Sequence, residues 1–127
     1  MPSPDTPKKI RYTSRSVEVH VDRPRTEVWP DVVAMVEAQG SSTALSVEPP
    51  WRLVYEVPTD ATLLSFWQST VLIRDDGPTC HVAWGIVFDP DPAAEVVAAA
   101  DVIVDGMRTA LRGLTGPGAR ADGSTNR

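Results

Sequence analysis

The sequence predicts an α+β fold in which a curved antiparallel sheet wraps around a long C-terminal helix. Three observations support this prediction. Several runs alternate apolar and polar residues, as half-buried strands do. One long apolar stripe near the end has helical spacing. The elements follow the order strand, helix, several strands, helix, which is typical of an α+β arrangement. With 127 residues, 42% of them apolar and 23% charged, the chain has the composition of one globular domain with short tails.

The first predicted strand covers Ser16 to Val21, where valine alternates with polar residues. The next three residues, Asp22-Arg23-Pro24, open a helix because proline is favoured in a first turn. Apolar residues then recur at helical spacing up to Gln39-Gly40; these are Val28, Val32, Met35 and Val36. Pro30 lacks a backbone N–H, so we expect a kink or a late helix start there.

The middle of the chain predicts four strands separated by turns. A short strand is expected at Thr43 to Val47, before Pro49-Pro50, and Trp51 to Val57 forms the next. Thr62 to Ile73 is rich in aromatic and β-branched residues and predicts a long strand. A turn at residues 75–78 then leads into a strand from Thr79 to Phe88, giving a hairpin.

The phase of the strand 62–73 stays open, because both alternating sets contain apolar residues. One set is Leu64, Phe66, Gln68, Thr70 and Leu72; the other is Leu63, Ser65, Trp67, Ser69 and Val71. We favour the set with Phe66 and Gln68 as the inward one. The strand 79–88 is less ambiguous, since its most apolar set is expected to face the core; this set is Cys80, Val82, Trp84, Ile86 and Phe88.

The last predicted element is a helix of more than five turns. Asp91 is expected to be its N-cap, with Pro92 at the first helical position. Apolar residues follow at spacings of three and four; these are Val97, Ala100, Val104, Met107, Leu111 and Leu114. The segment Thr115-Gly116-Pro117-Gly118 ends the helix, and residues 115–127 are expected to be a disordered tail.

The charge distribution argues against nucleic acid as a partner. Residues 1–15 carry a net charge of +3 and are expected to form a flexible basic arm, and residues 115–127 carry +1. Because the whole chain carries −5, the body at residues 16–114 carries −9. An acidic body repels phosphate backbones, so the sequence predicts no nucleic-acid binding there.

Several chemistries find no support in the residues. The single cysteine, Cys80, excludes an internal disulfide and any multi-thiolate metal site within one chain, and it is expected to be a buried small hydrophobe. The sequence lacks a phosphate-binding glycine loop, a hydrolase nucleophile elbow and a zincin motif. No signal peptide or membrane span is expected, so the predicted location is the cytoplasm.

Three segments resemble the START-like superfamily, also called SRPBCC or helix-grip. They are Ser16 to Trp29 (SVEVHVDRPRTEVW), Pro49 to Val57 (PPWRLVYEV) and Asp76 to Pro90 (DGPTCHVAWGIVFDP). They occur in the family's order, cover roughly residues 16–114, and are most similar to the polyketide cyclase/dehydrase-like group. The resemblance implies a helix-grip fold with a ligand cavity between the sheet and the C-terminal helix.

The chain departs from the family between the first helix and Pro49. Members usually have a second short helix and a further strand pair there, whereas only Ala38 to Glu48 fills the gap. Part of the usual sheet is therefore expected to be missing, with Thr43 to Val47 left as an open edge and one cavity wall uncovered. An open edge or apolar wall is commonly covered by a second copy, so we expect a homodimer.

The expected cavity is apolar and aromatic. Its predicted ligand-binding residues are Leu53, Phe66, Val82, Trp84, Ile86, Val104 and Met107. Tyr55 is the candidate catalytic donor of a hydrogen bond to a ligand carbonyl, with Gln68 assisting, while Trp84 and Phe66 stack on the ligand. The alternative is that these side chains fill a small core and that Tyr55 is a packed aromatic residue.

The histidines share a different face. His20 and His81 have the parity of Glu18, Arg52 and Glu56, so this face is expected to be solvated. If dimerisation enclosed it, His81 and Glu56 could form an acid/base pair. No metal and no cofactor are expected, because no close ligand spacing supports a site.

Two functions therefore remain open. In one, the protein binds a small hydrophobic molecule, polyketide-like or lipid-like, and promotes intramolecular aldol cyclisation and dehydration as part of a biosynthetic route. In the other, it is a non-catalytic carrier or sensor of such molecules, or a protein-interaction module. The scarcity of acid/base residues favours the second function.

Overall fold

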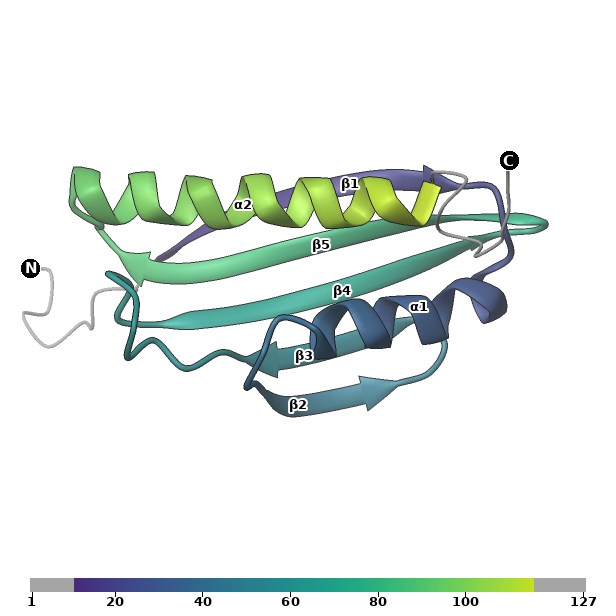
Figure 1. Cartoon of the computed structure of the whole chain (residues 1–127), viewed down its shortest axis with the longest axis horizontal. Coiled ribbons are helices and arrows are strands. Elements are labelled where there is room, and N and C mark those ends of the chain that lie inside the picture. The colour runs from purple at the N-terminus through teal and green to yellow at the C-terminus, as the bar shows by residue number, and fades with distance from the viewer. Residues whose placement is uncertain (1–10, 116–127) are drawn as a thin grey trace, which may run out of the picture.

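The computed structural model describes residues 11–115 of the chain, which form a five-stranded sheet and two helices (Figure 1). The elements, in chain order, are β1 (Tyr12–Val21), α1 (Arg25–Glu37), β2 (Thr43–Glu48), β3 (Arg52–Glu56), β4 (Trp67–Asp76), β5 (Thr79–Pro90) and α2 (Ala94–Thr115). The predicted α+β class and the long C-terminal helix are confirmed.

The sheet is antiparallel throughout, with the strand order β1-β5-β4-β3-β2. The helix α2 runs along β1 and β5, while α1 lies over the other half of the sheet (Figure 1). Both helices contribute buried residues to one core cluster, so they cover the same face of the sheet. Within residues 11–115, no helix lies over the opposite face.

The core is centred on β5. Its inward set, Cys80, Val82, Trp84, Ile86 and Phe88, is completely buried, as predicted from alternation. The predicted stripe of α2 packs against it through Ala100, Val104, Met107, Leu111 and Leu114. The first residue of the predicted stripe, Val97, is only half-buried, and its neighbour Val96 packs against the core. This match explains the helix, because a 22-residue amphipathic helix is stabilised mainly by burying one apolar face.

The inward phase of β4 is the opposite of the one we favoured. Ser69, Val71 and Ile73 are buried, whereas Leu72 is exposed. The register explains this phase, since Val71 lies opposite Trp84 of β5 and Ser69 lies opposite Ile86. The strand also begins later than predicted: residues 62–66 belong to the connection from β3, and β4 starts at Trp67.

Three element boundaries differ from expectation. The strand β1 begins at Tyr12, so residues 12–15 of the predicted arm are part of the sheet. The helix α1 begins at Arg25, directly after Pro24, and continues through Pro30 instead of starting late. The helix α2 begins at Ala94, after Asp91 has taken a left-handed conformation (φ 45°), so Asp91 is not its N-cap. Residues 1–10 of the arm and 116–127 of the tail lie outside the described residues.

The predicted open edge is present. The strand β2 pairs only with β3, so its other side has no neighbouring strand in the described chain. Its pairing is interrupted between Ala44 and Ser46, where Leu45 has no partner on β3. None of the described helices is both long and apolar enough to cross a membrane.

Candidate functional site

A largely apolar groove lies between the end of α1 and the edge of the sheet. It has a volume of about 440 Å³. We call it the α1–β2 groove; its lining residues are Val33, Val36, Glu37, Gly40, Ser41, Ser42, Ala44, Val47, Leu53 and Tyr55. The groove is the part of the sheet–helix space that no further strand covers, because β2 is the last strand on this side.

Tyr55 connects this groove to the core. Its side chain lines the groove but is only 2% exposed. The indole Nε1 of Trp84 donates a hydrogen bond to the Tyr55 hydroxyl oxygen over 2.8 Å, and the Ser69 side chain is a further hydrogen-bond partner of Tyr55. Ser69 in turn accepts a hydrogen bond from Trp67 Nε1 over 3.0 Å. Four polar groups of β3, β4 and β5 therefore form one buried network.

Burial keeps Tyr55 protonated. Burial raises the pKa of the Tyr55 phenol above its ordinary value of 10.0, while the hydrogen bonds from Ser69 and Trp84 act in the opposite direction. At neutral pH the group is therefore an O–H donor. Because Trp84 donates to the phenol oxygen, the Tyr55 O–H is polarised and becomes a better donor.

The predicted catalytic pair is not brought together. Tyr55 and Leu53 both line the α1–β2 groove, as expected. Gln68 is on the outer face of β4, where its cross-strand neighbours are Glu56 and Val87. The assignment of Gln68 as a partner of Tyr55 is therefore wrong, because the true phase of β4 turns it away from the helices.

Apart from Leu53, the predicted ligand-binding residues separate into three places. Trp84 is buried behind Tyr55 and touches it through the indole hydrogen bond. Phe66 lies in the connection before β4, where its ring is 4.9 Å from that of Tyr12, and it does not line the groove. The remaining four, Val82, Ile86, Val104 and Met107, pack in the core between the sheet and α2.

The sequence reasoning missed one side of the groove. Val33 and Val36 come from α1, and Ala44 and Val47 come from β2. Ser69 was missed for a different reason, since its strand was assigned the wrong phase. Arg74 is the signal that could have indicated the phase. Because β4 continues to Asp76, Gln68 and Arg74 lie on the same face of the strand, and a charged arginine favours the outer face.

The outer face of the sheet carries the histidines. His20 lies directly opposite His81, and His81 Nε2 is 2.5 Å from Glu18 Oε1. The suggested pairing of His81 with Glu56 does not occur, because Glu56 lies beside Gln68 while His81 lies beside Arg74, at the other end of β4. Among residues 11–115 no three His, Cys, Asp or Glu side chains gather as a metal site would require.

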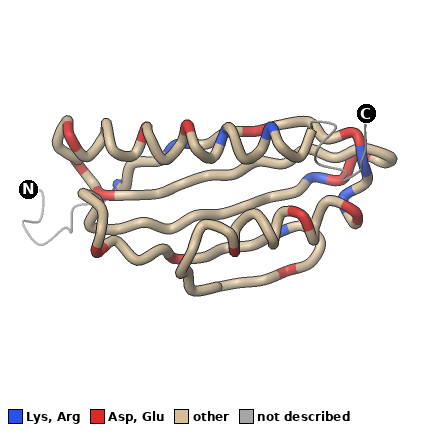
Figure 2. The backbone as a smooth tube through the Cα atoms, viewed as in Figure 1, with Lys and Arg blue, Asp and Glu red and all other residues tan. Residues whose placement is uncertain are grey.

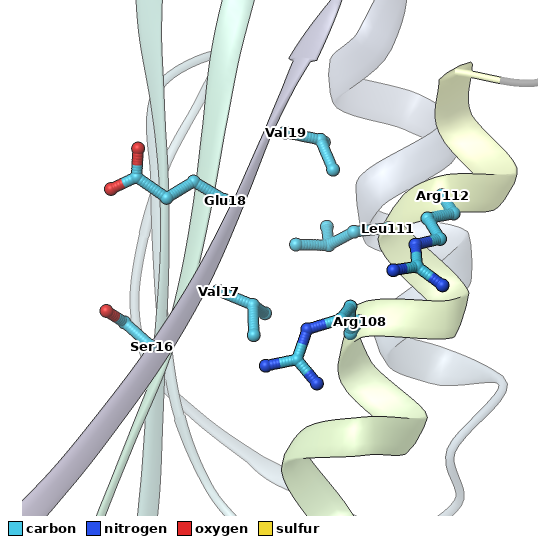
Figure 3. Close-up of a pocket in the computed structure, with 7 residues that line it drawn as sticks. All are labelled: Ser16, Val17, Glu18, Val19, Arg108, Leu111 and Arg112. Atoms are coloured by element: carbon cyan, nitrogen blue, oxygen red, sulfur yellow. The ribbon is translucent and has the colours of Figure 1, made fainter.

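A second groove lies between β1 and α2 (Figure 3). Val17, Val19 and Leu111 line its apolar floor, and the side chains of Arg108 and Arg112 extend from α2 toward β1. Arg108 is paired with Asp105 over 2.7 Å. Charged guanidinium groups keep their hydration at such an open surface, so this groove suits an apolar molecule less well than the α1–β2 groove does.

Cys80 is buried, as predicted, at the far end of the sheet from Tyr55. Burial raises the pKa of its thiol, and the charge of Asp75 raises it further, whereas Arg23 and Arg25 lower it. A protonated, enclosed thiol is a poor nucleophile, so Cys80 has a packing role.

No protein-family model and no curated protein sequence matches the chain. Solved structures show the same fold. The di-domain aromatase/cyclase BexL from the BE-7585A biosynthetic pathway is similar over 81% of the chain, with a TM-score of 0.65 and 15% identity. CalU16 from Micromonospora echinospora is similar over 80% of the chain and 73% of its own length, with a TM-score of 0.63 and 16% identity.

DynU16, a protein of the dynemicin biosynthetic locus, is similar over 80% of the chain, with a TM-score of 0.56 and 17% identity. The chain spans only 45% of the length of BexL and 46% of that of DynU16. At these identities the similarity establishes a shared fold, an antiparallel sheet with a long C-terminal helix, as the START-like resemblance implied.

Proposed function

We propose that the α1–β2 groove binds a small hydrophobic molecule of the polyketide or lipid class, and that the protein promotes intramolecular aldol cyclisation and dehydration of a poly-ketone held there. The observation that carries the proposal is the composition of the groove, in which five apolar residues, Val33, Val36, Ala44, Val47 and Leu53, are joined by Tyr55 and Glu37. Ligand sites in proteins are mostly apolar concavities with a few placed polar groups, and this groove has that composition.

Binding in such a groove would supply part of the catalysis. A flexible poly-ketone has many conformers, and only a few bring the reacting carbon close to the carbonyl it attacks. The apolar walls from Val33, Val36, Ala44 and Val47 can select a folded conformer, so that the entropy of orientation is lost on binding and not in the reaction.

Two side chains have suitable chemistry for the reaction itself. The phenol O–H of Tyr55 can donate a hydrogen bond to the carbonyl oxygen that becomes negative. Glu37 is the acidic residue among those that line the groove, and its carboxylate can take the proton from the carbon next to a second carbonyl. The new C–C bond then forms at the polarised carbonyl carbon. That oxygen is protonated and leaves as water with a hydrogen of the adjacent carbon.

The structural neighbours support this class of ligand at the level of fold. BexL is named an ARO/CYC protein of the BE-7585A biosynthetic pathway, and DynU16 is named as a protein in the dynemicin biosynthetic locus. A fold supports many functions, so this support is weaker than that of the groove residues.

A non-catalytic role is the second candidate, and one observation favours it. The Tyr55 hydroxyl already has partners in Trp84 and Ser69, so its hydrogen bonds can serve the core alone. The protein would then carry or sense a hydrophobic molecule without changing it.

Native mass spectrometry of the gently purified protein tests binding, together with titration of an environment-sensitive apolar dye. We expect a retained apolar adduct or dye binding that Val33→Trp removes by filling the groove from α1. Ala34→Trp is the matched control, because Ala34 is an exposed residue of α1 outside the lining. Equal dye binding by wild type and Val33→Trp would contradict the site.

Turnover of a synthetic poly-β-ketone thioester separates the two candidates. The cyclase proposal expects that Glu37→Gln keeps the dye affinity but lowers the cyclisation rate at least tenfold, within the range general bases contribute. A wild-type protein that binds the compound and leaves its spontaneous cyclisation products unchanged would be a carrier or sensor.

The open edge of β2 supports the expected homodimer as part of the proposal, because the groove lies directly beside it.

A further inference from the structure

We propose that a second copy of this chain covers the α1–β2 groove and supplies its missing wall. The contact surface, which we call the open side, consists of residues 38–47, which follow the last residue of α1 and include all of β2 except Glu48. The inference depends on the proposed function only for what the closed cavity would hold. The contact itself follows from the exposure, charge and strand pairing of these residues.

The open side combines exposure with apolar side chains. Residues 37–45 are all exposed, an unbroken run of nine. Within it and next to it, Leu45 is 49% exposed and Val47 is 51% exposed. Val47 and Ala44 also line the groove, so the apolar wall continues from inside the groove out to the surface. Large apolar side chains that continue a groove mark an interaction surface more strongly than scattered ones.

The charge pattern favours a copy of the same chain as the partner. No charged residue occurs from Ala38 to Val47, and Figure 2 shows the backbone between α1 and the end of β2 in tan up to the acidic residue that closes the strand. Glu48, at the end of β2, is neutralised by Arg52 over 2.7 Å. Depletion of charge is the compositional mark of an interface centre. Because the body of the chain is acidic, two copies repel each other on most faces. At the open side they can meet without placing like charges against each other.

The free edge of β2 allows backbone pairing with a second copy but limits the length of that pairing. A free strand edge presents unpaired N–H and C=O groups, which a second copy can satisfy. The irregularity at Leu45 interrupts the regular pairing of β2, and such a bulge shortens any ladder between two edges. The contact therefore depends mainly on burial of Ala44, Leu45 and Val47, with few backbone hydrogen bonds.

In a dimer with two-fold symmetry, the open side of one copy would contact the open side of the other. In an isologous dimer the same patch occurs on both sides, so each open side faces its symmetry mate. Neighbouring strands are about 4.8 Å apart, so two β2 edges in contact place the two grooves side by side on the same sheet face. Val47 and Leu45 of the partner would then close the side of each groove that the fold leaves open.

Sedimentation velocity at micromolar concentration tests the contact with Leu45→Glu. Leu45 is exposed and is not among the groove-lining residues, so the change leaves the fold and the groove of each single chain intact. We expect wild type at twice the 13.8 kDa of one chain and the variant at 13.8 kDa. Val102→Glu is the control, because Val102 is 72% exposed on α2, and it should stay dimeric. A monomeric wild type, or a dimeric Leu45→Glu, would overturn the proposal.

Dye titration on the same samples separates this inference from the proposed function. If the partner completes the site, the monomeric Leu45→Glu variant binds the dye at least tenfold more weakly than wild type and Val102→Glu. If the monomeric variant binds equally well, the groove functions in one chain and the completion by a partner is wrong. A wild-type dimer that binds no dye would refute the proposed function while leaving the open side as the dimer contact.

Discussion

Tyr55 is the residue at which the core and the candidate site meet. Trp84 has one donor, its indole N–H, and the Tyr55 hydroxyl accepts it inside the protein. Both side chains are almost completely buried, so no water is available to replace this bond. A buried donor that loses its acceptor has a cost well above the net value of one hydrogen bond.

The substitution Tyr55→Phe keeps the ring and removes only the hydroxyl. We expect it to lower the free energy of unfolding by about 1–3 kcal/mol, because the Trp84 N–H is left without an acceptor. Urea unfolding followed by tryptophan fluorescence measures this change.

Tyr12→Phe is the matched control for this experiment. Tyr12 is the other tyrosine of the chain, and its side chain is exposed at the start of β1. Its loss of a hydroxyl should change stability by less than about 0.5 kcal/mol, as surface substitutions usually do. Equal effects of the two substitutions would mean that the buried hydrogen bond contributes nothing to stability.

At the scale of elements, the strands and helices could be predicted from the sequence where only one periodicity fits. The strand β5 has a single apolar face, and α2 has one apolar stripe, so both were predicted with the correct inward residues except Val97 of α2. In β4 both faces contain apolar residues, and only the register with β5 decides between them. Pairing with a distant strand is a tertiary effect that local alternation does not contain.

The connection before β4 depends on Asp89 of β5. Its carboxylate accepts hydrogen bonds from the backbone N–H groups of Ser65 and Phe66, over 2.8 and 3.1 Å. Desolvation acts to raise the pKa of Asp89, but these hydrogen bonds outweigh it and the pKa lies below the ordinary value of 3.8. The ionised form is therefore the one that holds residues 65–66 against the end of β5.

This shift makes the connection sensitive to acid. A carboxyl whose pKa is lower in the folded than in the unfolded protein stabilises the fold above its unfolded pKa, and this stability is lost as the pH falls through the folded pKa. We expect Asp89→Asn to lower the urea midpoint at neutral pH, with the difference from wild type disappearing as the pH drops below 3.8.

The measurement is a series of urea midpoints against pH for wild type, Asp89→Asn and the control Asp60→Asn. Asp60 is exposed in the same connection, so its change should leave the pH series like that of wild type. A difference between wild type and Asp89→Asn that stays constant down to low pH would show that the charge of Asp89 is not what holds the connection.

At the scale of the whole molecule, the candidate site depends on the strand pair that is missing between α1 and Pro49. The sequence predicted this gap. The open edge followed from the short segment between α1 and Pro49, and β2 is indeed the last strand of the sheet. The position of the groove could not be predicted, because its walls come from α1 and β2, whose distance is set by packing. Of the residues that line the groove, only Leu53 and Tyr55 were predicted as cavity residues. The alternation of apolar and polar residues along β3 places both on the face that the helices cover.

The net charge makes a further prediction about the dimer as a whole. Each chain carries −5, so two copies repel at long range, whereas the proposed contact between the open sides is uncharged. Salt screens the repulsion, because the Debye length falls from about 30 Å at 0.01 M to about 10 Å at 0.1 M ionic strength. It leaves the burial of Leu45 and Val47 unaffected, since that contribution does not depend on charge.

We therefore expect the dimer to tighten as salt is added. Sedimentation equilibrium between about 0.01 M and 0.1 M ionic strength should show the Kd falling several-fold, since the repulsion is screened over this range. An interface made of ion pairs behaves in the opposite way, because salt weakens attraction between opposite charges. A Kd that rises with salt would thus place the contact elsewhere, at a charged surface such as the arginine-lined groove between β1 and α2.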